Sequence, residues 1–137
     1  MSKLIMIDDN PMEHFIMQKI FRRHELFPDC DHATDAQLII DFLSENRHHP
    51  AELPELIFLD WNMPVCDGFE FLEQFERLGL SFQKPISIYV VSSSIDENDR
   101  RKALAYPFVR EFLMKPVGKD KLEQIYATYF KTNRKAG

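Results

Sequence analysis

Short apolar runs along this chain alternate with longer segments in which apolar residues recur with the period of a helix. Such alternation is typical of βα units whose strands form a parallel sheet. The pattern therefore predicts an α/β fold with five strands. The runs that we interpret as strands cover residues 4–7, 30–33, 56–59, 86–91 and 112–114.

The segments between the apolar runs carry helix start signals and apolar stripes. Asn10 before Pro11 combines an N-cap side chain with a first-turn proline, which predicts a helix over 11–24. Thr34 and Gln37 form a capping box ahead of a second helix, and a third follows Gly68. The stripes expected to face the sheet are Leu38, Ile39, Phe42 and Leu43; Phe69, Phe71, Leu72 and Phe75; and, in the last helix, Leu122, Ile125, Tyr126 and Tyr129.

The helix predicted over 96–105 differs from the others because its first two turns are fully polar. Only Ala103 and Leu104 give it an apolar edge. A helix with so little apolar surface is held loosely. Its charged residues form either a solvated face or a movable helix that binds a partner.

Composition fits one globular domain of 137 residues, of which 45% are apolar and 28% charged. The formal net charge of −5 argues against direct binding of nucleic acid, which needs clustered Lys and Arg. We expect residues 1–131 to form the domain and the basic residues 132–137 to be a flexible tail.

Cysteine content and the N-terminal run bear on the compartment. Cys30 and Cys66 are too few for a disulfide framework, so we expect reduced thiols in a cytoplasmic protein. The apolar run before Asp8 has only four residues, so we expect neither a signal peptide nor a membrane anchor.

Polar side chains stand at the ends of four predicted strands: Asp8 and Asp9, then Asp60, then Ser92, and finally Lys115. In a parallel sheet these ends meet at one edge, where ligands bind. Three carboxylates and one ammonium leave a net charge of −2, which a divalent cation balances. An all-oxygen donor set favours Mg²⁺ over zinc. Mg²⁺ and a lysine together can bind a phosphoryl group, with an aspartate as its acceptor and a serine hydroxyl as hydrogen-bond donor.

With these motifs in place, the chain resembles the receiver domains of two-component response regulators, in particular the stand-alone ones similar to chemotaxis regulators. The resemblance covers nearly the whole sequence. The matching motifs, each at its own strand end, are IDD at 7–9, LDWNMPVCDG at 59–68, VVS at 90–92 and FLMKP at 112–116.

The resemblance implies a doubly wound, flavodoxin-like (βα)5 fold with strand order 2-1-3-4-5. It implies that Asp60 accepts a phosphoryl group from a sensor histidine kinase or a histidine phosphotransfer protein. Mg²⁺ would be bound by Asp9, Asp60 and the backbone carbonyl of Asn62, with Asp8 acting mainly through water. Lys115 would pair with Asp60 and then with its phosphoryl group. In this family the Lys115–Pro116 bond is typically cis.

The resemblance also implies a switch. Ser92 would swing toward the phosphoryl group, and Phe112, in the place of the family's switch aromatic, would turn inward as it does so. The face formed by the fourth helix, the fifth strand and the fifth helix would change and bind a downstream protein. The chain would then be a single-domain regulator, monomeric or dimeric on phosphorylation, rather than an enzyme acting on a diffusible substrate.

Two alternatives stay open on the sequence. One is a receiver-like module that binds partners without being phosphorylated. The other is a phosphohydrolase of the haloacid-dehalogenase type, which the sequence disfavours because Asn62 stands where that family needs a general acid. We expect Trp61 to be half-exposed at the rim of the site, and the five histidines show no ligand spacing for zinc.

Overall fold

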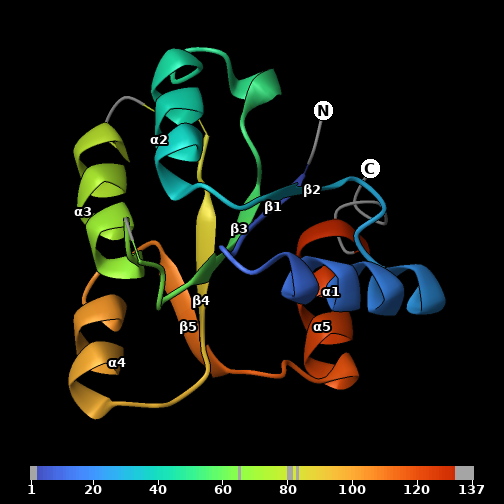
Figure 1. The fold of residues 1–137 in the computed structure, drawn as a ribbon. Coiled ribbons are helices and arrows are strands. Elements are labelled where there is room, and N and C mark those ends of the chain that lie inside the picture. The colour runs from blue at the N-terminus through green and yellow to red at the C-terminus, as the bar shows by residue number, and fades with distance from the viewer. Residues whose placement is uncertain (1–2, 65, 80–81, 83, 132–137) are drawn as a thin grey trace.

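The computed structural model describes residues 3–64, 66–79, 82 and 84–131, so the tail predicted at 132–137 lies outside the described residues. The described chain forms one parallel five-stranded sheet with strand order β2-β1-β3-β4-β5, as expected for a doubly wound, flavodoxin-like fold (Figure 1). The strands are β1 (Leu4–Ile7), β2 (Cys30–Ala33), β3 (Leu56–Asp60), β4 (Ser87–Ser92) and β5 (Val109–Met114).

Helices cover both faces of this sheet. Figure 1 shows α1 and α5 on one face and α2, α3 and α4 on the other. Their bounds are α1 Pro11–His24, α2 Ala36–Glu45, α3 Gly68–Gly79, α4 Glu97–Leu104 and α5 Lys119–Tyr126. A 3-10 turn, η1, spans Pro50–Glu52, and a π-helical turn, η2, extends α5 over Ala127–Lys131.

The three central strands are buried along their whole length, which explains their continuous apolar runs. Their side chains belong to two hydrophobic cores, one on each face of the sheet. Register places Ile7 beside Leu59 and Asp60 beside Val91, so β1, β3 and β4 end next to one another. This alignment puts the residues after the strands at one edge.

The second helix differs from its prediction. Its N-cap is Asp35 rather than Thr34, and the Asp35 carboxylate accepts the N–H groups of Gln37 and Leu38. The buried stripe consists of Ala36, Ile40 and Leu43, whereas Leu38 is 63% exposed. Of the predicted stripe, Leu43 is fully buried and Ile39 and Phe42 pack partly buried against the core, so only Leu38 departs from the prediction. Packing against the sheet and α3 turns the helix so that Ala36 and Ile40 are buried instead of Leu38.

The fifth strand is longer than its apolar run indicates. It begins at Val109, which pairs with Ile88 of β4, instead of at Phe112. The exposed Arg110 and the half-buried Glu111 interrupt the apolar run, so the pattern of apolar residues does not indicate that the strand begins at Val109. An edge strand tolerates such polar side chains, whereas a central strand excludes them. None of the described helices is both long and apolar enough to cross a membrane.

Candidate functional site

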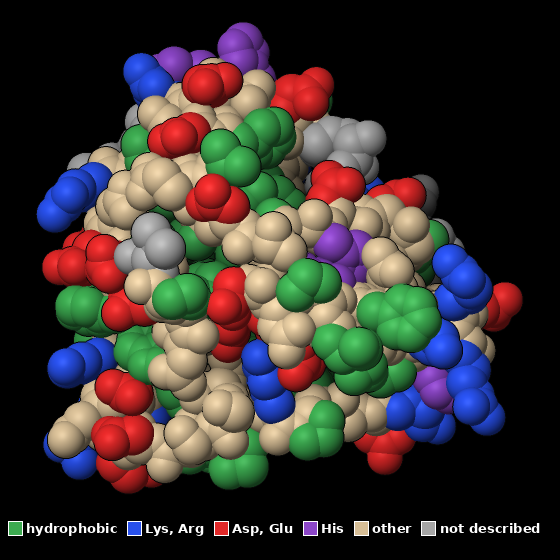
Figure 2. Space-filling model, in the orientation of Figure 1, with side chains coloured by type: hydrophobic (Ala, Val, Ile, Leu, Met, Phe, Trp, Pro, Cys, Tyr) green, Lys and Arg blue, Asp and Glu red, His purple; other side chains and the backbone are tan. Residues whose placement is uncertain are grey.

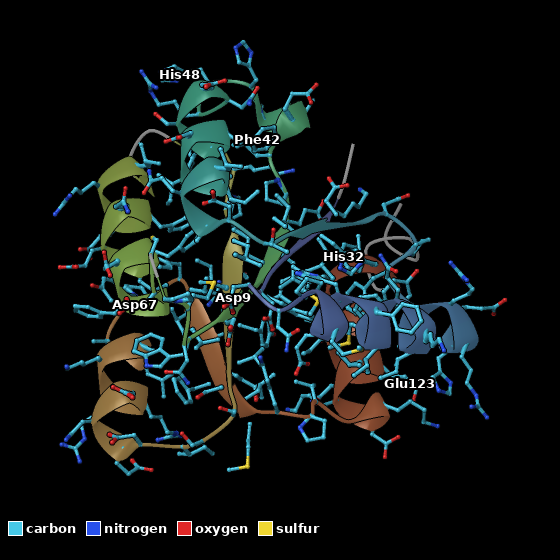
Figure 3. All side chains as sticks on the ribbon, in the orientation of Figure 1. Asp9, His32, Phe42, His48, Asp67 and Glu123 are labelled. Atoms are coloured by element: carbon cyan, nitrogen blue, oxygen red, sulfur yellow. The ribbon has the colours of Figure 1, made fainter. Side chains whose placement is uncertain are left out.

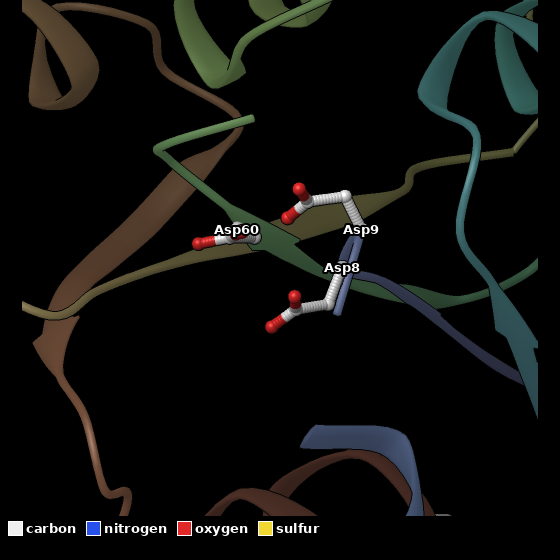
Figure 4. A group of neighbouring side chains, drawn as sticks. All are labelled: Asp8, Asp9 and Asp60. Carbon is white, nitrogen blue, oxygen red and sulfur yellow. The ribbon is translucent and has the colours of Figure 1, made fainter. Parts of the chain in front are cut away.

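Three carboxylates meet where β1 and β3 end. Asp8 and Asp9 follow β1, Asp60 is the last residue of β3, and one carboxylate oxygen of each lies within 4.8 Å of the others (Figure 4). Asp8 and Asp60 are buried, whereas Asp9 is exposed. The convergence predicted from the strand ends is therefore present in the structure.

Lys115 brings a positive charge to these carboxylates from the end of β5. Its Nζ lies 2.8 Å from Oδ2 of Asp8 and 3.3 Å from Oδ1 of Asp60. Its backbone N–H donates to the carbonyl of Ser92 at 2.8 Å, and the bond to Pro116 is cis. Lys115 thus bridges two aspartates, and its shorter contact is to Asp8 rather than to Asp60.

Burial and the charge of Lys115 have opposite effects on the pKa of Asp60. Burial raises the pKa of Asp60 to about 6, the charge of Asp8 adds to the effect, and Lys115 opposes it. For Lys115, burial by itself lowers the pKa, but the hydrogen bond to Asp8 and the charges of Asp60 and Asp8 raise it overall. The lysine therefore stays charged and favours the carboxylate form of its partners.

The donor set fits a hard divalent cation. The cluster offers only carboxylate oxygens, which Mg²⁺ prefers, and neither His nor Cys is part of it. Octahedral Mg²⁺ holds oxygens at about 2.1 Å, so no two of its ligands lie more than about 4.2 Å apart. One oxygen of each carboxylate lies within 4.8 Å of the others, so the three groups converge on a space of the size that one such ion occupies.

Ser92 is buried at the end of β4, and its hydroxyl is engaged in the loop that follows. It donates to the carbonyl of Ser94 at 2.7 Å and accepts the Ser94 N–H at 3.3 Å. The side-chain amide of Asn62 donates to the same hydroxyl at 3.3 Å. Ser92 and Asn62 therefore contact each other at the rim of the carboxylate cluster.

Trp61 corrects one expectation from the sequence. The residue is only 6% exposed instead of half-exposed, and its indole packs against Phe69 and Phe112. Gly68 makes room for it, because a Cβ there would lie 2.7 Å from Trp61 Cε3. Phe112, the predicted switch residue, is buried in the same core.

Two histidines to which the sequence assigns no role, His14 and His32, are hydrogen-bonded in a row to the backbone of Asp8. Nε2 of the buried His14 lies 2.7 Å from the carbonyl oxygen of Asp8, which can only accept, so this nitrogen carries the proton. Nδ1 of His14 lies 2.7 Å from Nδ1 of His32, a hydrogen-bond distance across which one ring donates and the other accepts. His32 lies on β2 next to α1 (Figure 3). Its pKa is lowered, mainly by burial and to a smaller extent by the nearby His14. Because 18 residues separate them, no local pattern indicated this pair.

Both cysteines are free thiols, as expected. Burial is the main reason that the pKa of Cys30 is raised to about 12 and that the pKa of Cys66 is also raised. Since the thiolate is the reactive form, neither residue is an activated nucleophile.

The carboxylate cluster opens onto the surface beside α3 and α4. Figure 2 shows acidic side chains next to a basic one near the middle of this face, with hydrophobic side chains around them. A hollow of about 730 Å³ is lined by Asp9 together with Asn62, Pro64, Asp67 and Lys102. A reactant can therefore reach the exposed Asp9 side of the site.

Comparison with known proteins agrees with this geometry. Residues 4–127 match the family described as "Response regulator receiver domain". The chain is 25% identical over 138 residues to a probable methanogenesis regulatory protein, FilR2, of Methanothrix harundinacea, covering 98% of this chain and 87% of that protein.

Solved structures show the same fold. A two-component response regulator from Cytophaga hutchinsonii superposes with a TM-score of 0.79 and 26% identity over 91% of this chain and 93% of that one. The receiver domain of Saccharomyces cerevisiae Ssk1, in a co-crystal with the histidine phosphotransfer protein Ypd1, gives 0.74 and 22% identity over 95% and 89%. At the latter identity the likeness concerns the fold alone.

Proposed function

Because the chain belongs to the response regulator receiver domains of two-component signalling, we propose that it is a single-domain regulator switched by phosphorylation of Asp60. The observation that carries this proposal is the bridge from Lys115 to Asp8 and Asp60, inside a group of three carboxylates that lie within 4.8 Å of one another. The partner-only receiver and the phosphohydrolase remain alternatives that the experiment below addresses.

The reaction would be transfer of a phosphoryl group from a phosphohistidine to Asp60. A carboxylate oxygen of Asp60 forms a bond to phosphorus, the phosphorus–nitrogen bond of the donor breaks, and the departing imidazole nitrogen takes a proton from solvent. Lys115 lies 3.3 Å from the acceptor carboxylate, so its ammonium would neutralise charge on the transferred group. Its pairing with Asp8 holds it at that place.

Asp8, Asp9, Asp60 and the backbone carbonyl of Asn62 are the proposed ligands of a Mg²⁺ ion. Bound there, the ion would supply positive charge to the phosphoryl oxygens. The exposed Asp9 offers a direct carboxylate ligand, whereas Asp8 is already hydrogen-bonded to Lys115 and to the N–H of Asn10. That difference supports a direct role for Asp9 and a role through water for Asp8.

The proposed switch lies between this site and the face of α4, β5 and α5. Ser92 would exchange its hydrogen bond to Ser94 for one to the phosphoryl group, which would release the loop that leads into α4. Ala103 is the one described residue that α4 buries fully, so this helix is weakly anchored and able to respond. Phe112 of β5 lies between the two regions as the proposed switch aromatic.

The proposed donor is a sensor histidine kinase or a histidine phosphotransfer protein, and the receiver of Ssk1 bound to Ypd1 supports the second class. A downstream protein would bind the α4, β5 and α5 face. We propose a cytoplasmic protein that is monomeric or forms a homodimer on phosphorylation, and that contacts neither nucleic acid nor membrane directly, in keeping with its net charge of −5.

Intact-mass measurement after incubation with acetyl phosphate tests the proposal. We expect the wild-type protein to gain one phosphoryl group only with Mg²⁺, and Asp60→Asn to gain none. Asp67→Asn is the matched control, because this aspartate lies in the same loop but caps α3 through the N–H of Glu70. Uptake by Asp60→Asn at the wild-type rate would overturn the assignment.

A wild-type protein that binds Mg²⁺ but takes up nothing from acetyl phosphate or from phosphorylated histidine phosphotransfer proteins would favour the partner-only receiver. Steady release of inorganic phosphate from many phosphate esters would instead favour the phosphohydrolase. Neither result is compatible with a phosphorylation-switched regulator.

A further inference from the structure

A pair of buried rings connects the residue after Asp60 with β5. The indole of Trp61 and the ring of Phe112 are arranged edge to face, with centroids 5.7 Å apart and planes at 69°. The two side chains are 6% and 8% exposed. This geometry is one of the favourable arrangements of aromatic pairs.

The backbone of Trp61 is fixed on both sides, so its indole has little freedom to move. Its N–H donates to Val91 of β4 at 2.9 Å, and its carbonyl accepts the N–H of Gly68 at 3.0 Å. The indole is pressed against Gly68, where a Cβ would lie 2.7 Å from Cε3, and Phe69 packs on it at 6.3 Å. If Phe112 turned outward, Trp61 would therefore be unable to follow it.

The position of Phe112 does not depend on a displaced Ser92. In the same structure the Ser92 hydroxyl donates to Ser94 and is held in the loop after β4. Phe112 is nonetheless buried against Trp61. The ring is thus buried against Trp61 while the Ser92 hydroxyl is engaged elsewhere.

We propose that Trp61 is a positioning residue that holds Phe112 buried both before and after phosphorylation of Asp60. The inference rests on the proposed function and revises one step of it: Phe112, the proposed switch aromatic, does not rotate when Asp60 is phosphorylated. The conformational change is then transmitted from Ser92, at the end of β4, through the loop that contains Ser94 to α4.

Fluorine NMR of 4-fluorophenylalanine placed at position 112 measures the exposure of this ring. The difference in chemical shift between H2O and D2O reports contact with solvent, and beryllofluoride with Mg²⁺ mimics the phosphorylated aspartate. We expect a small difference, typical of a buried ring, with Mg²⁺ alone and with beryllofluoride. A ring that is exposed in one condition and buried in the other would overturn the proposal.

Variants of Trp61 separate positioning from general stability. We expect Trp61→Leu, which fills space but lacks a ring, to increase the solvent effect at the label several-fold with Mg²⁺ alone. Trp61→Phe restores a ring and should return it to the wild-type value. A Trp61→Leu protein that folds by circular dichroism and leaves the label buried would contradict the proposal. If that variant fails to fold, the wild-type comparison still decides.

Failure of the proposed function would be recognised separately. The intact mass after acetyl phosphate treatment reports whether Asp60 is an acceptor, and it does not depend on Phe112. A wild-type protein that takes up phosphate but shows an exposed ring with Mg²⁺ alone would refute only the inference about Trp61.

Discussion

At the scale of single residues, burial and ion pairing have opposite effects on the pKa of Asp60. Burial and the neighbouring Asp8 raise its pKa to about 6, whereas Lys115 lowers it. The carboxylate, not the carboxylic acid, is the nucleophile. In the metal-free protein the proposed acceptor is therefore mainly a carboxylate at neutral pH and becomes protonated in mild acid.

The raised pKa of Asp60 also predicts how stability depends on pH. Between the ordinary carboxyl pKa of 3.8 and the folded-state pKa of about 6, the folded state binds more protons than the unfolded state, so the free energy of unfolding falls as pH rises through this window. One proton limits the slope to about 1.4 kcal/mol per pH unit. We expect urea denaturation with a metal chelator, at pH values from 4 to 7, to show this fall in the wild type.

Asp60→Asn is the matched comparison, because the amide has the shape of the carboxylic acid and does not titrate. The wild type should lose stability relative to this variant as pH rises, and the variant should be the more stable protein at pH 7. Parallel stability curves for the two proteins would show that Asp60 titrates at its ordinary pKa.

At the scale of elements, the junction between β3 and α3 is the most tightly specified part of the site. β3 ends at Asp60, Trp61 turns into the core, and α3 begins at Gly68, whose N–H donates to the Trp61 carbonyl. The backbone comes so close here that only glycine fits at position 68. By contrast, α4 rests on a single fully buried residue, Ala103.

Gly68→Ala tests this close approach. The added Cβ would lie 2.7 Å from Trp61 Cε3 and 2.9 Å from Trp61 Cα, and a backbone-anchored atom has little room to move. We expect a loss of about 1–3 kcal/mol in urea denaturation, the usual range for an overpacked core. Gly79→Ala is the control, because a Cβ there meets nothing within 4 Å and this glycine ends α3 without a positive φ. Equal stability of the two variants would contradict the proposed tight fit.

At the scale of the whole molecule, the sheet order joins residues that are distant in sequence into one charged site. Asp8 and Lys115 are 107 positions apart, and their contact needs β1, β3, β4 and β5 to be aligned. A cation that neutralises the repulsion among the three carboxylates is therefore expected to stabilise the whole folded chain against unfolding.

This coupling predicts that Mg²⁺ raises the thermal stability of the protein. A ligand that binds only the folded state stabilises it by about 2.7 kcal/mol at 100 times its dissociation constant. We expect Tm to rise with Mg²⁺ concentration in the wild type and to respond much less in Asp9→Asn, which removes the exposed carboxylate ligand. A Tm that responds to Mg²⁺ equally in both proteins would exclude Asp9 from the metal site.

Local patterns in the amino-acid sequence are enough to predict the α/β class, the approximate strands and helices, and the residues at the strand ends. It could do so because apolar periodicity and capping side chains are local signals, and because the ends of parallel strands share one edge. The strand ends accordingly predict a site of Asp8, Asp9, Asp60 and Lys115, and the structure brings these residues together.

How side chains from distant segments pack becomes visible only in the folded chain. Leu38 of α2 is exposed although it continues the apolar stripe, and Trp61 is buried instead of half-exposed because Gly68 admits it to the core. The pairing of His14 with His32 depends on α1 lying beside β2. Each of these contacts joins residues that no local pattern relates, since burial is a property of the packed chain and not of a segment.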